Sequence, residues 1–334
     1  ARASADSRAE ALSYHKTNIR REKNMAITAA MVKELREMTG VGMMDCKKAL
    51  TETDGDMEKA VELLREKGLA ASAKKAGRIA SEGIVDVYLS DDNKVGTIVE
   101  VNSETDFVAK NQVFRDYVAA VAKQASTTTA TDMDAFFAEK WDLDPQFTVK
   151  EALSQQVAVI GENLNIRRFE KFEKVGSGRL VSYIHGGGRI GVLIELACDN
   201  DSDALEELGK NVAMQIAALN PKFIAEKDVP ADFIEKETEI LTVQAKNDPK
   251  NANKPENIIA KMIEGRLKKE MKEFCLIEQP YVKDGDLTVK KYIDSVAKEV
   301  GAPIEITRFV RFETGEGLEK KDENFADEVA KAMQ

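Results

Sequence analysis

Residues 83–101 read GIVDVYLSDDNKVGTIVEV and predict two strands joined by a tight turn. Both ends of the stretch are rich in β-branched residues, and the polar run between them holds the Asp and Asn typical of turns. Two strands so close in sequence pair antiparallel as a hairpin. This hairpin sets the fold class, and the rest of the chain can be placed around it.

The same pattern recurs further along the chain without a gap. Gly178–Ile184 (GRLVSYI) aligns with Gly83–Leu89, and Ile190–Leu196 (IGVLIEL) aligns with Val95–Val101. A tyrosine, a glycine and a glutamate coincide in the two copies, as the pairs Tyr88/Tyr183, Gly96/Gly191 and Glu100/Glu195. Each copy continues into a loop and a helix, so the sequence predicts an α+β fold with a duplicated antiparallel core covered by helices on one face.

The loop after the first hairpin, Asn102–Asn111 (NSETDFVAKN), places an acid and a large aromatic side by side. Apolar residues from Phe107 to Val121 recur at helical spacing, which predicts one helix that opens at Thr105 or Asp106. Phe107 is then either a staple packed on its own helix or an exposed contact.

The repeat bears on this choice. Asp106 aligns with Asp201, as expected if both acids cap helices, whereas Phe107 aligns with Ser202. A feature needed only to close the fold should recur in both copies. After this comparison, the sequence supports the staple and the exposed contact equally well as interpretations of Phe107.

The second hairpin turn contains the pattern G-x-G-x-x-G at Gly186–Gly191. A dinucleotide site requires a helix after these glycines, but here a second strand follows, so we interpret them as a hairpin turn. His185 stands at the tip, where the first copy has Ser90. The residues alone favour an ordinary turn residue at this position.

The N-terminal region predicts three short helices. Thr28 caps the first, the run Thr39–Gly42 ends it, the second runs from Met43 to about Leu50, and the third begins at Met57 and stops at Gly68. Such a unit resembles a ubiquitin-associated-type bundle. Met43 and Met44 are core filler or an adaptable contact surface, with core slightly favoured.

Helical patterns at Pro230–Lys246 and Glu256–Phe274 predict a helical hairpin arm, and a terminal amphipathic helix carries Phe325 and Val329. We expect the tail to be disordered or not native. The expected parts are a basic tail at 1–24, a helical bundle at 25–72, a linker at 73–80, a first core half at 81–174, a second core half at 175–312 with the arm at 230–274, and a C-terminal helix module at 313–334.

Composition excludes several classes of function. With 334 residues and a net charge of -10, the chain lacks the basic balance of a nucleic-acid binder, and no apolar run approaches the ~20 residues that cross a bilayer. Three scattered cysteines indicate a reducing compartment, and with His15 and His185 as the only histidines a His/Cys zinc site is nearly excluded. No catalytic motif occurs, so we expect a protein that is not an enzyme.

Two stretches are similar to the signatures of a known family, bacterial elongation factor Ts. They are Leu35–Leu50 (LREMTGVGMMDCKKAL) and Thr105–Asn111 (TDFVAKN), and the order of the parts resembles that family from Met25 to Gln334. The resemblance implies a cytoplasmic guanine-nucleotide exchange factor that binds GDP-loaded elongation factor Tu and promotes GDP release. It implies no cofactor of its own, because Mg²⁺ and nucleotide belong to the partner.

The resemblance also implies roles for single residues. Around the nucleotide site of the partner these are Thr105, Asp106, Phe107, Val108 and His185; in the N-terminal bundle they are Arg36, Met43, Met44 and Lys47; in the C-terminal helix they are Phe325 and Val329. No direct nucleic-acid or membrane contact is expected, and dimerisation through the core or the arm stays open. The alternatives are an adaptor acting through the ubiquitin-associated-like bundle and a nucleotide-binding enzyme using Gly186–Gly191.

Overall fold

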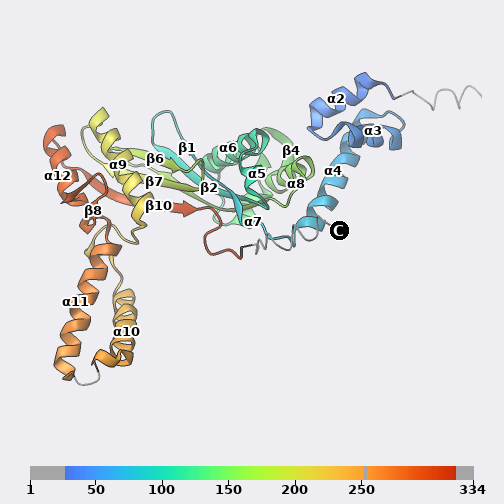
Figure 1. The fold of residues 1–334 in the computed structure, drawn as a ribbon. Coiled ribbons are helices and arrows are strands. Elements are labelled where there is room, and N and C mark those ends of the chain that lie inside the picture. The colour runs from blue at the N-terminus through green and yellow to red at the C-terminus, as the bar shows by residue number, and fades with distance from the viewer. Residues whose placement is uncertain (1–26, 252–253, 321–334) are drawn as a thin grey trace, which may run out of the picture. The chain divides into compact units, whose positions relative to one another are not determined.

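The computed structural model describes residues 27–251 and 254–320 (Figure 1). Within these ranges the chain forms two compact units, one from residues 27–80 and 131–165, the other from residues 81–130 and 166–320. The chain therefore changes unit after residues 80, 130 and 165. The tail at 1–24 and the segment with Phe325 and Val329 lie outside the described residues.

The first unit begins with the predicted three-helix bundle, formed by α2 (Ala29–Thr39), α3 (Met43–Glu52) and α4 (Met57–Lys75). The Thr28 hydroxyl accepts a hydrogen bond from the Met31 N–H, and Gly40 ends α2 in the left-handed conformation. Apolar residues of the three helices pack into one core, consisting mainly of Val32, Leu35, Cys46, Ala49, Leu50, Ala60 and Leu64.

The prediction that the third helix stops at Gly68 is wrong, because α4 continues to Lys75. Its second half packs on α8 (Val149–Ile160), and Arg65 forms an ion pair with Glu151. Gly68 is buried there, where an added Cβ would lie 3.7 Å from the Ser154 carbonyl oxygen. A tertiary partner thus extends the helix past a residue that would end an isolated one.

Residues 131–165 belong to this unit, although the sequence analysis assigned them to the first half of the core. The α4 helix also occupies the first part of the expected linker at 73–80. Besides α8, this segment contains three short elements, α7 (Met133–Ala138), β3 (Lys140–Trp141) and β4 (Asp144–Thr148).

The second unit contains two three-stranded sheets, and its two hairpins confirm the predicted repeat. The first sheet has the order β1-β2-β5 and the second the order β10-β7-β6. Glu100 lies opposite Val85 in the first hairpin, and Glu195 lies opposite Leu180 at the matching position of the second. The strands are β1 (Glu82–Leu89), β2 (Val95–Ser103), β5 (Asn165–Glu173), β6 (Arg179–His185), β7 (Ile190–Ala197) and β10 (Glu305–Glu313).

Both sheets contribute to one apolar layer between them, and each has a long helix on its other side. The layer comprises Val85, Ile98, Phe172, Leu180, Leu193 and Phe312. The helix α6 (Gln112–Thr127) packs on β1 and β2, and α9 (Asp203–Leu219) packs on β6 and β7 (Figure 1). The fold is therefore the expected α+β core with helices over the outer faces.

The repeat extends further than the sequence analysis found. After α9 come β8 (Pro280–Tyr281), β9 (Asp284–Thr288) and α12 (Val289–Val300), which match β3, β4 and α8. Thr148 and Thr288 cap the two equivalent helices, and Gly161 and Gly301 end them in the left-handed conformation. The second copy is longer because the helical arm is inserted before β8.

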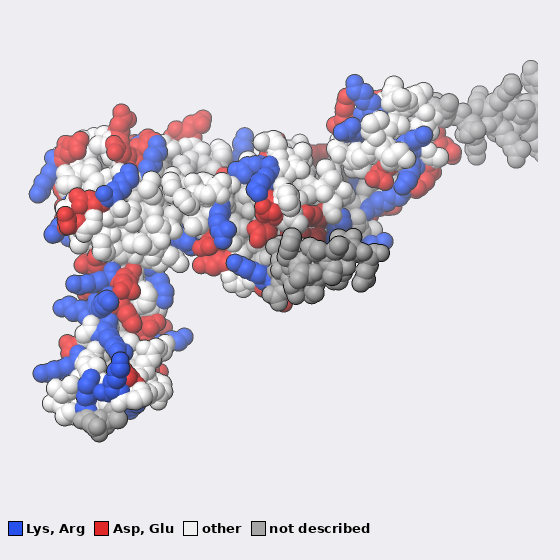
Figure 2. Space-filling model, viewed as in Figure 1, with Lys and Arg blue, Asp and Glu red and all other residues white. Residues whose placement is uncertain are grey.

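The arm consists of α10 (Ala231–Asn247) and α11 (Glu256–Phe274), which pack side by side (Figure 1). Leu241, Ala245 and Ile263 form its small core. Figure 2 shows Lys and Arg interspersed with Asp and Glu over the visible face of the arm. Three short 3-10 helices complete the described chain, η1 (Glu226–Asp228), η2 (Pro249–Asn251) and η3 (Leu276–Glu278).

Candidate functional site

The segment with the acid and the aromatic forms a helix of its own, α5 (Asp106–Ala109), with Thr105 as its N-cap. The predicted single helix is wrong: the Asn111 side chain accepts from the Val113 N–H and starts α6 separately. Val108 is buried and anchors α5, while the Ser103 hydroxyl donates to the Thr105 carbonyl. The break leaves α5 as a short projection between β2 and α6.

Phe107 is 78% exposed, so it is a surface residue and not a staple. Asp106 is the first residue of α5 and not its cap. Its carboxylate lies 2.6 Å from the Lys110 ammonium, which is also 5.8 Å from the centre of the Phe107 ring. In the second copy the helix cap is Ser202, and Asp201 pairs with Arg179. The expectation that both acids cap helices is therefore wrong.

His185 ends β6 and is exposed. The Tyr183 hydroxyl lies 3.0 Å from its Nδ1 atom. After it, Gly186, Gly187 and Gly188 all have positive φ values, of 59°, 68° and 109°. Strand β7 follows directly, which confirms that these glycines form a hairpin turn.

The α5 helix and the His185 turn border the same cleft, of about 340 Å³, within the second unit. The Arg115 guanidinium donates to the carbonyls of Ala109 and Gly187, both at 3.1 Å, and so bridges the two elements. The cleft is lined by Ser81, Glu82, Gly83, Ile84, Asp106, Ala109, Lys110, Arg115, Gly186, Gly187, Arg189, Thr314 and Lys320.

The charge of the cleft is mainly positive, since its walls carry four cationic and two anionic side chains: Lys110, Arg115, Arg189, Lys320, Glu82 and Asp106. On β1, burial raises the pKa of Asp86, while the Val87 N–H and the charge of Arg115 act in the opposite direction. Arg115 therefore also faces a partly buried acid.

In the first unit, Met43 and Met44 are 49% and 66% exposed. The slight preference for a core role is therefore wrong, because Cys46, Ala49 and Leu50 fill the inward face of α3. Met38 on α2 is also exposed, as are Arg36 and Lys47. These side chains form a soft, polarizable surface with positive charges on the same two helices.

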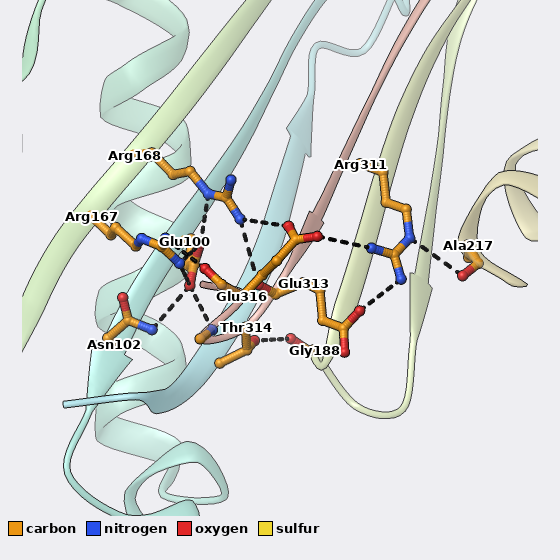
Figure 3. A network of polar contacts seen from close by, with 11 residues as sticks. Glu100, Asn102, Arg167, Arg168, Gly188, Ala217, Arg311, Glu313, Thr314 and Glu316 are labelled. Atoms are coloured by element: carbon orange, nitrogen blue, oxygen red, sulfur yellow. Dashed lines mark hydrogen bonds and ion pairs between the residues drawn. The ribbon is translucent and has the colours of Figure 1, made fainter. Parts of the chain in front are cut away.

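Sequence reasoning missed a polar network centred on Glu100, which is fully buried (Figure 3). Its carboxylate accepts from Arg167, from Arg168 and from the Gly315 N–H, at 3.0, 2.6 and 2.8 Å. Glu195, its counterpart in the repeat, pairs instead with Lys174 and Arg308. The coincidence of two glutamates in otherwise apolar strands was the available signal.

The three thiols are inaccessible. Cys46, Cys198 and Cys275 are free thiols and all buried, and burial raises the pKa of Cys275 to about 11. Over residues 27–251 and 254–320, no set of three His, Cys, Asp or Glu side chains is grouped as metal ligands would be. No helix in those same ranges is both long and apolar enough to span a bilayer.

Comparison with known proteins identifies the family. The model of the family described as Elongation factor TS matches residues 104–316. The chain is 57% identical over 307 residues to elongation factor Ts of Clostridium novyi (strain NT). The aligned region covers 92% of this chain and 99% of the relative. For elongation factor Ts of Clostridium botulinum (strain Eklund 17B / Type B) the identity is 58% with the same coverage. The relative from Clostridium tetani (strain Massachusetts / E88) is 56% identical over 308 residues, 92% of this chain and 100% of its own length. The chain thus belongs to the elongation factor Ts family.

Proposed function

We propose that this elongation factor acts as a guanine-nucleotide exchange factor in the cytoplasm, binding GDP-loaded elongation factor Tu and promoting GDP release. Phe107 carries the proposal, because it is 78% exposed on a short helix whose Asp106 and Ala109 border a cleft shared with the His185 turn. An isolated exposed apolar residue is common on protein surfaces. Here the aromatic, the acid and the histidine come from two elements held together by Arg115.

Nucleotide exchange requires no reactive group on this chain. The factor stabilises a conformation of the partner that binds GDP poorly, and by linkage GDP weakens the binding of the factor to the same extent. Phe107 is the apolar group that becomes desolvated when the partner docks, and such a residue contributes about 2 kcal/mol or more. Asp106 brings a negative charge toward the place where the partner holds phosphates, which opposes anion binding there.

Thr105 and Val108 support this contact as the cap and the buried anchor of α5. Met43 and Met44, with Arg36 and Lys47, form a second contact with the partner. The exposed methionines suit this role, because flexible thioether side chains adapt to the surface they meet. Phe325 and Val329 would supply a third contact from outside the described residues.

The test is stopped-flow release of a fluorescent GDP analogue from elongation factor Tu. We expect strong acceleration by the intact chain and a loss of about 30-fold for Phe107→Ala, which corresponds to about 2 kcal/mol. The midpoint of thermal unfolding should stay unchanged, because the side chain is exposed. Val175→Ala is the matched control, since Val175 is an exposed apolar residue on another turn of the same unit.

No acceleration by the intact chain would refute the proposal. Acceleration that survives both Phe107→Ala and Asp106→Ala would keep the function but remove α5 from its centre.

An adaptor that binds a protein through the N-terminal bundle is the second candidate, favoured by the exposure of Met43 and Met44. It predicts that Met43→Ser with Met44→Ser abolishes partner binding while Phe107→Ala has no effect. Direct titration of labelled partner with each variant separates the two functions.

A further inference from the structure

The turn that carries His185 has little intrinsic rigidity. Gly186, Gly187 and Gly188 follow it, each with a positive φ. Glycine reaches this conformation without strain, but it also moves among more conformations than any other residue. The N–H groups of Gly188 and Arg189 close the turn on the His185 carbonyl, whereas the carbonyls of Gly187 and Gly188 accept from donors outside the turn.

Two side chains from other elements hold this turn at consecutive carbonyl groups. The Arg115 guanidinium of α6 donates to the Gly187 carbonyl, and the Thr314 hydroxyl donates to the Gly188 carbonyl, both at 3.1 Å. The Val85 N–H of β1 also donates to Gly188, and the Thr314 N–H donates to Arg189. External donors thus supply the restraint that the glycines lack.

Arg115 also ties the turn to α5. The same Nη1 atom lies 3.1 Å from the carbonyl of Ala109, the last residue of that helix. The last carbonyls of a helix have no partner within it, and a planar guanidinium offers several donors in a rigid arrangement. One side chain therefore connects the helix of Phe107 with the turn of His185.

Thr314 is itself held in place by the buried network (Figure 3). The Gly315 N–H donates to Glu100, and the Glu316 carbonyl accepts from Arg167 at 2.7 Å. Gly315 has φ +71°, and an added Cβ would lie 2.1 Å from the Ser81 carbonyl oxygen. Residues 313–316 are therefore pinned against β1, β2 and β5, and Thr314 cannot move away without breaking these contacts.

We propose that Arg115 and Thr314 are positioning residues for nucleotide exchange: they hold the His185 turn at a fixed place relative to α5, so that Phe107 and His185 meet the partner together. This inference rests on the proposed exchange function. A surface that is ordered before docking loses less conformational entropy on binding. Arg115 and Thr314 each hold the turn through side-chain hydrogen bonds. The net contribution of one such bond changes the equilibrium between the held and the released turn by about fivefold.

The first experiment needs no partner. Because His15 and His185 are the only histidines, ¹⁵N-histidine labelling gives two imidazole spin systems, and His185→Gln assigns them. We expect Thr314→Val and Arg115→Met to move the His185 signals toward those of a free histidine and to raise ring mobility. Thr314→Ser, which keeps the hydroxyl, should leave them in place.

Thr307→Val is the matched control. It removes a threonine hydroxyl that donates to the Glu195 carbonyl at 3.3 Å, on β10 of the same unit. Its His185 signals should equal those of the intact chain. Unchanged His185 signals in both Thr314→Val and Arg115→Met would overturn the proposal.

The second experiment measures exchange. Thr314→Val should slow GDP release by about fivefold in the intact chain and have no further effect in the His185→Ala background. Equal slowing in both backgrounds would show that Thr314 does not act through His185, which overturns its positioning role. If the intact chain fails to accelerate GDP release, the exchange function fails, and the imidazole signals still decide whether the two residues position the turn.

Discussion

At the scale of single residues, Glu100 and Glu195 show how one position of a repeat acquires two environments. Both are buried glutamates facing basic side chains, but only Glu100 accepts the N–H of Gly315 in the segment after β10 (Figure 3). A buried carboxylate is tolerated only where charges and hydrogen bonds compensate it. Glu100 is therefore both a fold residue and the anchor of residues 313–316.

The substitution Glu100→Gln should destabilise the second unit by about 3 kcal/mol, because it leaves Arg167 and Arg168 beside a neutral group. Urea unfolding measures the loss. Asp294→Asn is the control, because Asp294 pairs with Lys290 at a side-chain exposure of 53% and the change should cost less than about 1 kcal/mol. Equal losses in the two variants would contradict a special role for the buried network.

Apolar periodicity alone could not place Phe107, Met43 or Met44. A helical pattern identifies an apolar face, but it does not tell whether a first-turn residue points into that face or beyond it. The absence of an aromatic at Ser202 in the second copy was the sole sequence signal for the exposure of Phe107. Arg115 and Thr314 carried no signal, since their roles depend on carbonyl groups distant in sequence.

At the scale of elements, Gly68 and Gly315 have opposite structural roles. Gly68 lies inside α4, where a Cβ would meet only ordinary contacts, at 3.7 Å or more. Gly315 has a positive φ and no room for a Cβ beside Ser81. A glycine in the sequence suggests the end of a helix or strand, but only Gly315 lies just after such an end, that of β10 at Glu313.

Gly68→Ala should raise the free energy of unfolding of the first unit by up to about 1 kcal/mol, because alanine has the higher helix propensity. Gly315→Ala should lower stability by more than about 1 kcal/mol, since the residue is strained and its Cβ collides with backbone. Differential scanning calorimetry of both variants measures the changes. A loss of stability in Gly68→Ala would mean that α4 and α8 pack more tightly than the contacts indicate.

The hairpins were predictable because each is a local feature with its own turn. The boundary between α5 and α6 was not, because it depends on one capping side chain, Asn111, in a stretch that keeps helical spacing. The second part of the repeat escaped detection since β3 and β8 have only two residues each and the arm shifts the alignment. Short elements and large insertions both weaken a periodic signal.

At the scale of the whole molecule, the first unit is discontinuous in sequence. Residues 27–80 contain the three-helix bundle. The second half of α4 extends past the core of this bundle and packs on α8, which comes from residues 131–165. The sequence indicated a boundary near residue 72, because the bundle pattern ends there. Residues 131–165 belong to the first unit because α8 packs on α4, and no local sequence pattern reveals such a tertiary contact.

A fragment of residues 25–80 should keep the core around Leu35 and Leu50 but lose protection in the second half of α4. Hydrogen exchange followed by mass spectrometry should show amides 66–75 exchanging much faster in the fragment than in the intact chain. Amides of α2 and α3 serve as the internal control. Equal protection of residues 66–75 in both samples would mean that α4 is stable without α8.

The discontinuity of the first unit also fixes an order of events during synthesis. Val149, the first residue of α8, is added 74 residues after Lys75, the last residue of α4 (149 − 75). At about 5–20 residues per second, the ribosome needs roughly 4–15 s to make that stretch. For this interval the nascent helix lacks its neighbour, while the whole hairpin of β1 and β2 is made. The N-terminal unit is thus begun first and completed only after the start of the second unit has been translated.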